Sequence, residues 1–199
     1  MRKKINVVTG NHGKVQLLQE HVSALGYEAV QVNLPIVEPQ ANSIEEVALS
    51  KATQAFQLLR EPLVVEDSGF YINELSGFPG PFTRYVLDTI GVNGLLRLAE
   101  PLVARTCSFY SVLAYMDAAG NVHTFVDAIG SGILAREIDD TPCEDAWSDL
   151  WRVFIPVGYS KTLVAFSGDE RAALWQKWRQ TSVYTQFAAW LAAEIKATP

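Results

Sequence analysis

An apolar run followed directly by two carboxylates sets the strongest limit on how this chain folds. The run is Leu63-Val64-Val65, and it predicts a short buried strand that ends where Glu66 and Asp67 begin. Two adjacent carboxylates at such a place are costly to desolvate unless a cation accompanies them, and Mg²⁺ is the usual hard cation. Ligands of open α/β sheets collect at the carboxyl ends of strands. The pattern therefore predicts a site, and a solvated acidic turn is the alternative interpretation.

A second candidate site lies near the N-terminus, between a predicted strand at Ile5 to Val8 and a helix that runs on to Leu25. The connecting loop reads Thr9-Gly10-Asn11-His12-Gly13-Lys14. The start of a helix offers backbone N–H groups and the positive end of its dipole to an anion, and Lys14 adds a full charge. The spacing is not that of a Walker P-loop. The loop indicates a phosphate site, and an ordinary capped turn is the alternative.

Strand and helix patterns continue to alternate along the chain. A strand is predicted over residues 29–34, and Ser43 with Glu46 three residues later forms a capping-box signature for the next helix. That helix carries Lys51, which we expect to be a solvated charge. The remaining predicted elements are a helix over 83–99 interrupted at Gly91, a hairpin over 107–129, a short strand at 153–156 and a helix from Asp169 to the end.

Length and composition restrict the class of protein. The 199 residues suffice for one substantial core, so we predict a single domain over residues 1–199. A formal net charge of −6 argues against a general binder of nucleic acid or of anionic membranes. The two cysteines, Cys107 and Cys143, lack metal-ligand spacing, which favours a reducing compartment. No stretch is predicted to be a signal peptide or a transmembrane helix, so we expect a soluble cytoplasmic protein.

These motifs together resemble those of the inosine triphosphate pyrophosphatase (ITPase, XTP/dITP diphosphatase) family. The loop at residues 9–14 is similar to the family's opening Thr/Ser-x-Asn-x-x-Lys motif, and residues 66–85 are similar to its second block. Residues 43–52, 130–133 and 156–162 also fall in family order, so the resemblance spans nearly the whole chain. It implies a two-lobed α/β fold of the Maf/ITPase superfamily, with a long mixed central sheet flanked by helices, in a homodimer.

The resemblance also implies an activity, which is the Mg²⁺-dependent hydrolysis of a purine nucleoside triphosphate to the monophosphate and pyrophosphate. Asp67 would bind the metal and accept a proton, and Glu66 would assist the metal site. Glu38, in the segment before the second helix, is the candidate for a further metal ligand. The residues implied to contact the substrate are Thr9, Gly10, Asn11, Lys14, Ser68 and Lys161.

The part expected to grip the base departs from the family pattern. A block resembling Gly-Phe-Gly-Tyr-Asp-Pro is expected before Phe154, but residues 146–153 contain no glycine and their only aspartate, Asp149, is displaced. The family's Ser-His-Arg falls on Trp175-Gln176-Lys177, and an upstream lysine falls on Arg171. A glutamine offers both a donor and an acceptor, and a lysine keeps the charge of arginine without its bidentate geometry.

We therefore hypothesise that the preferred base differs from hypoxanthine or xanthine, with Arg171, Gln176 and Lys177 as candidate contacts. Trp147 or Trp151 would suit stacking on a modified base, although core packing is the simpler interpretation. A catalytically silent nucleotide-binding or regulatory protein is the main alternative. A pyrophosphatase for pyrimidine nucleotides is a further one, although its opening motif typically differs from residues 9–11.

Overall fold

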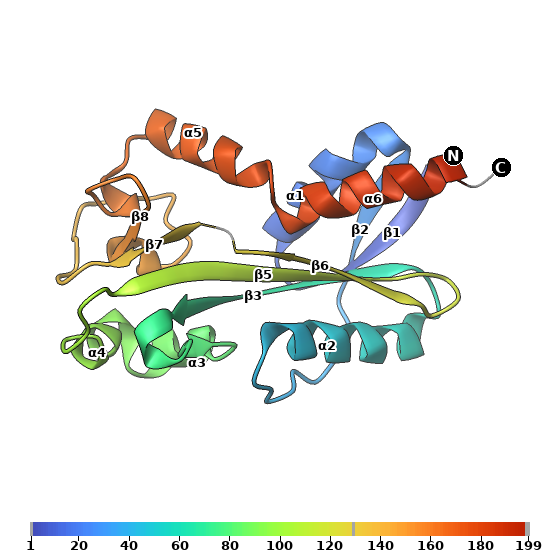
Figure 1. Ribbon diagram of the computed structural model, residues 1–199. Helices are drawn as coiled ribbons and strands as arrows, with labels where there is room; N and C mark the ends of the chain where they lie inside the picture. Colours follow the sequence, from blue (N-terminus) through green and yellow to red (C-terminus); the bar gives the residue numbers. More distant parts are fainter. Residues whose placement is uncertain (1, 129, 198–199) are drawn as a thin grey trace. The chain divides into compact units, whose positions relative to one another are not determined.

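The computed structural model describes residues 2–128 and 130–197, and its strands alternate with helices largely as predicted (Figure 1). The strands are β1 (Lys3–Val8), β2 (Tyr27–Val32), β3 (Leu63–Ile72), β4 (Pro79–Gly80), β5 (Thr106–Met116), β6 (Val122–Asp127), β7 (Ser131–Leu134) and β8 (Phe154–Pro156). Within the described residues they form one sheet in the order β2-β1-β3-β5-β7-β8, with β4 paired to β3 and β6 to β5. The β1–β2 and β1–β3 pairs are parallel and the β5–β6 and β7–β8 pairs antiparallel. The predicted α/β class with a long mixed sheet is confirmed.

The helices are α1 (His12–Val22), α2 (Ile44–Leu59), α3 (Thr83–Thr89), α4 (Gly91–Leu98), α5 (Gly168–Arg179) and α6 (Val183–Ala197). The first two begin as their sequences predict, because a polar side chain at each N-cap accepts a backbone N–H bond. Asn11 accepts from the Gly13 amide, and Ser43 accepts from the Glu46 amide. After α1 a short 3₁₀ turn ends at Gly26, whose φ of 81° lies in the left-handed region.

Contacts divide the chain into two compact units. The first unit comprises residues 1–68, 111–127 and 179–199, and the second comprises residues 69–110 and 128–178. The long strands β3 and β5 contribute residues to both. That the two units form a single domain stays a prediction.

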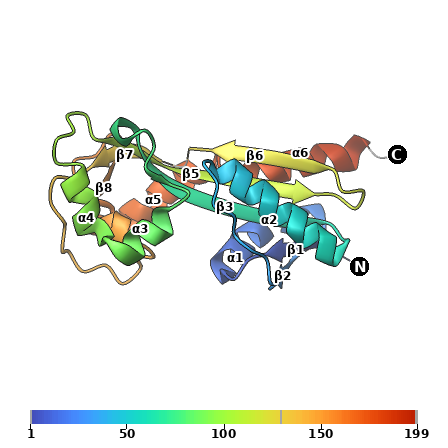
Figure 2. The same cartoon turned by 90° about the horizontal axis from the view of Figure 1, so that it is seen from below.

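In the first unit, α1 and α6 cover one face of the strands and α2 covers the other (Figures 1 and 2). The core on the side of α1 and α6 is formed by buried apolar residues of β1, α1, β3, β5 and α6, among them Val7, Leu18, Val64, Leu113 and Phe187. Strand alternation explains why β3 can send one side chain to each face in turn.

In the second unit, α3 and α4 lie on one side of the strands and α5 on the other (Figure 1). Its core is rich in aromatic side chains, with Phe70, Trp151 and Phe154 buried together. Trp175 and Trp178 of α5 are partly buried and pack against this cluster. These two tryptophans of α5 are thus packing residues.

Two expectations about the elements are wrong. The strand that begins at Leu63 does not end at Glu66 but continues as β3 to Ile72. It can do so because Glu66 finds buried polar partners and Phe70 and Ile72 are themselves core residues. The single helix expected from Asp169 is two helices, because the chain turns at residues 180–182 and the Ser182 hydroxyl accepts from the Thr185 amide, starting α6 anew.

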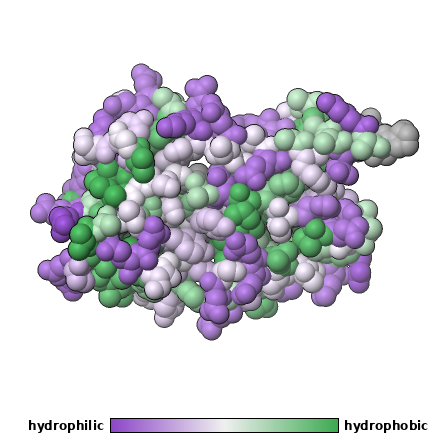
Figure 3. Space-filling model, in the orientation of Figure 1, coloured by the Kyte–Doolittle hydropathy of each residue, from purple (hydrophilic) through white to green (hydrophobic). Residues whose placement is uncertain are grey.

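On the face shown in Figure 3, hydrophilic residues predominate and small groups of hydrophobic residues lie among them. None of the helices within residues 2–128 and 130–197 combines the length and the hydropathy needed to cross a membrane.

Candidate active site

The two carboxylates of β3 point to opposite faces of the strand, because neighbouring side chains alternate. Glu66 is only 8% exposed and lies on the side of α1 and α6. Asp67 lies on the side of α2, where it meets Lys51. Each carboxylate has its own lysine, and the two ion pairs are close enough for Asp67 and Lys51 both to influence the pKa of Lys14.

The first ion pair joins Lys14 of α1 to Glu66. The Lys14 Nζ donates to the Glu66 side chain at 2.6 Å from Oε2 and to the Glu66 backbone carbonyl at 3.0 Å. Ser111 of β5, which is fully buried, donates a short hydrogen bond from its hydroxyl to Oε1 of the same carboxylate. Burial is the largest single influence and would lower the pKa of Lys14, but the Glu66 charge, the hydrogen bond to Glu66 and the Asp67 charge together outweigh it and the pKa is raised. Lys14 is therefore a fixed cation at neutral pH.

The second ion pair joins Lys51 of α2 to Asp67, and Glu38 completes a cluster of three charged side chains. Its Nζ lies 2.6 Å from Asp67 Oδ2 and 3.0 Å from Glu38 Oε2. The Lys51 and Asp67 side chains are 18% and 15% exposed, whereas that of Glu38 is 62% exposed. The expectation that Lys51 is a solvated charge is wrong. Burial is the largest single influence and opposes the charged form, but the charges and hydrogen bonds of Asp67 and Glu38 together outweigh it and raise the pKa of Lys51.

The loop between β1 and α1 has the strand–loop–helix geometry that its sequence predicted. The backbone N–H of Asn11 donates to the Thr9 hydroxyl at 3.0 Å. The side-chain oxygen of Asn11 in turn accepts from the backbone N–H of Gly13 at 2.8 Å. Gly10 is exposed, and an added Cβ there would meet no atom within 4 Å, so the backbone is open to an approaching ligand. The positive end of α1 thus faces an accessible loop, while the Lys14 Nζ at the start of the same helix is directed at Glu66.

Eight of the residues predicted from the sequence belong to the first unit, and several of them are in direct contact. They are Thr9, Gly10, Asn11, Lys14, Glu38, Glu66, Asp67 and Ser68. Ser68 is exposed, and its backbone amide donates to Asp67 Oδ1 at 3.1 Å, which helps to fix that carboxylate. Asp67 is thereby held through both oxygens.

Carboxylates of the Lys51 cluster suit a magnesium ion by their chemistry. Glu38 and Asp67 already direct one oxygen each at a common cation, the Lys51 ammonium. Mg²⁺ prefers oxygen ligands and is commonly held by one or two carboxylates together with water and substrate phosphates. Within the described residues no group of three or more His, Cys, Asp or Glu side chains forms a metal cage. Glu38 and Asp67 therefore fit a magnesium site with two carboxylate ligands, in which the substrate would supply further oxygen ligands.

The four predicted residues from the C-terminal part of the chain lie in the second unit. Lys161 is bound by both carboxylate oxygens of Glu170, at 2.8 and 2.9 Å, and this hydrogen bonding lowers the pKa of Glu170 to about 2. Arg171 donates to the Phe166 carbonyl at 2.5 Å, and its guanidinium also lies 3.5 Å from Asp145. Gln176 and Lys177 are exposed on α5.

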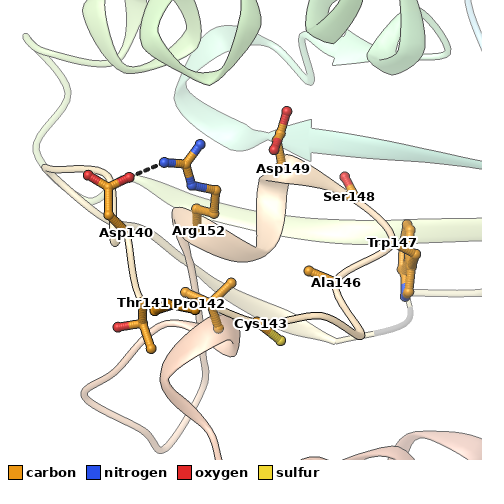
Figure 4. Close-up of a pocket in the computed structure, with 10 residues that line it drawn as sticks. Asp140, Thr141, Pro142, Cys143, Ala146, Trp147, Ser148, Asp149 and Arg152 are labelled. Atoms are coloured by element: carbon orange, nitrogen blue, oxygen red, sulfur yellow. Dashed lines mark hydrogen bonds and ion pairs between the residues drawn. The ribbon is translucent and has the colours of Figure 1, made fainter.

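Two open pockets lie on the second unit. One, of about 500 Å³, has Trp147 at one side and the ion-paired Asp140 and Arg152 at the other (Figure 4). The other, of about 300 Å³, is lined by Arg171 and by three tryptophans, Trp147, Trp151 and Trp175. Trp147 borders both pockets and is 70% exposed.

Trp151 is only 2% exposed, so its main role is core packing, which is the simpler of the two interpretations of its sequence position. Its indole N–H has no hydrogen-bond partner within the described part of the chain. Of the two tryptophans that the sequence suggested for stacking, Trp147 is therefore the one that a ligand could reach.

Sequence reasoning missed two polar residues of the site, Lys51 and Ser111. A signal for Lys51 existed, because it lies four residues from Val47 and four from Ala55, which are both buried on the same face of α2. No local signal marks Ser111, because it meets Glu66 across 45 residues of sequence.

Comparison with known proteins bears on the whole chain. The model of the Ham1 family matches residues 5–179. A protein of Methanopyrus kandleri named dITP/XTP pyrophosphatase is 33% identical over 187 residues, which cover 94% of this chain and 95% of that protein. A protein of the same name from Hyperthermus butylicus is 35% identical over 167 residues, covering 84% of this chain and 85% of that protein.

Solved structures agree on the fold. The Ham1 protein of Staphylococcus aureus superimposes with a TM-score of 0.78 at 20% identity, covering 96% of this chain and all of that one. A nucleoside-triphosphatase, described as a dITP/XTP pyrophosphatase, from Mycobacterium abscessus gives a TM-score of 0.73 at 23% identity, covering 88% of this chain and 95% of that one. At these identities the likeness concerns the fold alone.

Proposed function

The chain belongs to the Ham1 family, and on that premise we propose that it hydrolyses a non-canonical purine nucleoside triphosphate to the monophosphate and pyrophosphate. The relatives named dITP/XTP pyrophosphatase support this class of substrate. The observation that carries the proposal is the pairing of two lysines, Lys14 and Lys51, with the adjacent carboxylates of β3. Two fixed cations beside a partly exposed carboxylate are what a reaction at a polyphosphate needs.

The proposed reaction assigns a task to each group of the first unit. The loop from Thr9 to Asn11, the N-terminus of α1 and Lys14 bind the phosphate oxygens. Asp67 accepts a proton from the attacking water, whose oxygen forms a bond to the α-phosphorus as the bond to the β-phosphate oxygen breaks. Pyrophosphate leaves, and the monophosphate keeps the base and sugar. Ser68, beside Asp67 on the exposed side of β3, is proposed to contact the substrate.

We assign the metal to Glu38 and Asp67, whose oxygens converge on Lys51. Mg²⁺, when bound, neutralises negative charge on the phosphate oxygens. Glu66 would assist indirectly, because its carboxylate is already occupied by Lys14 and Ser111. Its task in the site is to hold Lys14 in place.

Recognition of the base is assigned to the second unit. Arg171, Gln176 and Lys177 are proposed to contact the base, and Lys161 to contact the substrate, on the ground of the sequence resemblance. Trp147 adds an exposed indole for stacking, beside the pocket that Arg171 lines. Because the family's glycine-rich block is missing, we keep the hypothesis that the preferred base differs from hypoxanthine or xanthine.

The test is pyrophosphate release with Mg²⁺ from ITP, XTP, dITP, the standard nucleotides and several ring-modified triphosphates. We expect release from a purine triphosphate, its loss in excess EDTA and its return when Mg²⁺ is added. If ITP and XTP exceed every other substrate by several orders of magnitude in kcat/KM, the altered-base hypothesis is rejected. If no nucleotide yields pyrophosphate, the result would instead favour a nucleotide-binding protein without catalytic activity.

We also propose a homodimer and a cytoplasmic location, which rest on the family resemblance and on composition. The larger exposed apolar side chains of the second unit include Phe78, Phe82 and Tyr85. We expect light scattering of the purified chain to give twice the mass of the 22.0 kDa protomer. A mass equal to one protomer at micromolar concentration would reject the dimer.

A further inference from the structure

Ser111 places a hydroxyl in a row of β5 side chains that otherwise packs into the core of the first unit. Residues two apart on a strand share a face, so Ser111, Leu113 and Tyr115 point to the same side of β5. Leu113 is fully buried in the core formed with α1 and α6, and Tyr115 packs against that core. Ser111 is fully buried as well. A hydroxyl at such a place is costly unless it has a hydrogen-bonding partner.

The partner of the Ser111 hydroxyl is the buried Glu66 carboxylate. The hydroxyl donates to Glu66 Oε1 and lies 3.4 Å from the backbone carbonyl oxygen of Asp67. The other carboxylate oxygen, Oε2, lies 2.6 Å from the Lys14 Nζ. The two oxygens of Glu66 are thus bound from different elements, one from β5 and one from α1. The carboxylate cannot rotate about its last bond without breaking one of these two contacts.

The orientation of Glu66 in turn decides where the Lys14 ammonium lies. An ammonium has three N–H donors, and Lys14 directs two hydrogen bonds at Glu66, one to the side chain and one to the backbone carbonyl. One donor is left for a phosphate oxygen, and the Lys14 side chain is 23% exposed. If the carboxylate rotates, the ammonium moves with it. A displacement of about 1 Å is enough to weaken a charged contact strongly.

We propose that Ser111 is a positioning residue for phosphate binding: its hydroxyl fixes the Glu66 carboxylate, and Glu66 fixes the Lys14 ammonium. The inference rests on the proposed function in one respect, namely that Lys14 receives a phosphate oxygen. If Ser111 served only the stability of the core, loss of its hydroxyl would lower the free energy of unfolding and leave the affinity for phosphate unchanged. A positioning role changes that affinity, and only while Lys14 is present.

The test variant is Ser111→Ala, measured by phosphorus NMR titration with inorganic triphosphate and by nucleotide kinetics. Alanine occupies nearly the space of serine and lacks the hydroxyl. We expect the Kd for inorganic triphosphate and the KM for the nucleotide each to rise about tenfold, with kcat changed less than about threefold. Ser111→Cys keeps a weak donor and should give a smaller rise in Kd. It also serves as the test variant if Ser111→Ala does not fold.

The route through Lys14 is tested by repeating Ser111→Ala in a Lys14→Met background. There the substitution should change Kd less than about twofold, because its effect passes through the ammonium that is no longer present. The NMR titration is run at millimolar triphosphate, so that the weaker binding of this background is still measured. Should Lys14→Met fail to fold, Lys14→Met with Glu66→Gln serves as the background, with the same expectation.

Ser182→Ala is the matched control. Ser182 belongs to the same unit and is 7% exposed, and its hydroxyl accepts from the Thr185 amide at the start of α6. Its loss should lower the melting temperature and leave Kd unchanged. A rise in Kd as large as that of Ser111→Ala would show that lost stability alone weakens binding, and would overturn the inference.

Three further results overturn the inference. They are an equal rise in Kd for Ser111→Ala with and without Lys14, no rise at all, and a wild-type chain that does not bind inorganic triphosphate. A chain that binds inorganic triphosphate but hydrolyses no nucleotide refutes the proposed function alone, and the coupling between Ser111 and Lys14 is still measured.

Discussion

Replacing Asp67 by Asn is expected to lower kcat/KM about 10³-fold while leaving the fold intact. The amide keeps the shape of the carboxylate but cannot accept a proton from water, and loss of a general base typically costs between about 10² and 10⁴ in rate. Lys51 retains Glu38 as a partner at 3.0 Å, so the substitution does not leave the Lys51 ammonium without a counter-ion. Pyrophosphate release and thermal unfolding would be measured on the same preparations.

The control for Asp67→Asn is the same change at Asp88. That carboxylate is 63% exposed and pairs with Arg84 on the surface of α3. Its loss should leave kcat/KM unaltered within about twofold, as expected of exposed pairs. Activity of Asp67→Asn within about tenfold of wild type would remove Asp67 from the role of proton acceptor.

Replacing Lys14 by Met should damage both activity and stability. Loss of one preorganised donor to phosphate is expected to lower kcat/KM about 10²- to 10³-fold. The buried Glu66 also loses its counter-ion and keeps the hydrogen bond from Ser111, so we expect a cost of about 2 kcal/mol in the free energy of unfolding. Lys4→Met, at an exposed lysine of β1, is the control.

Adding Glu66→Gln to Lys14→Met separates the two effects. A neutral amide needs no counter-ion, so the free energy of unfolding should recover while kcat/KM stays low. Recovery of activity in the double variant would contradict a direct role for Lys14.

The ion pair also makes stability depend on pH, because the pKa of Lys14 is raised in the folded chain. The stabilisation from the ion pair is complete below the ordinary value of 10.5 and is lost as pH rises through the raised pKa.

The sequence predicted the elements of the fold well where the signals are local. The caps at Asn11 and Ser43 and the break at Gly91 all depend on neighbouring residues, and the structure has them in place. The end of β3 was misjudged because Glu66 is satisfied by residues far away in sequence. A local pattern shows that a carboxylate interrupts an apolar run, but not that a lysine and a serine from distant segments bind that carboxylate.

Only part of the candidate site's local structure could be predicted. The residues from Thr9 to Lys14 form the loop and helix start that their sequence predicted, and the position of Lys51 on the packed face of α2 could have been found from helical spacing. The pairing of Lys14 with Glu66 and of Lys51 with Asp67 could not be predicted, because it depends on the face of β3 to which each carboxylate points. For base recognition the sequence departs from its family pattern, and the roles of Arg171, Gln176 and Lys177 stay predictions.

The first unit is assembled from three separate stretches of the chain, and this affects the order in which it can mature. Every residue proposed to touch phosphate in that unit is made among the first 68, as the nascent chain leaves the ribosome N-terminus first. Glu66 nevertheless gains its hydrogen bond from Ser111 only after β5 has been made, 45 residues later. A product shortened after Arg179 would carry the whole phosphate-binding sequence and still lack α6, whose buried residues share a core with those of α1.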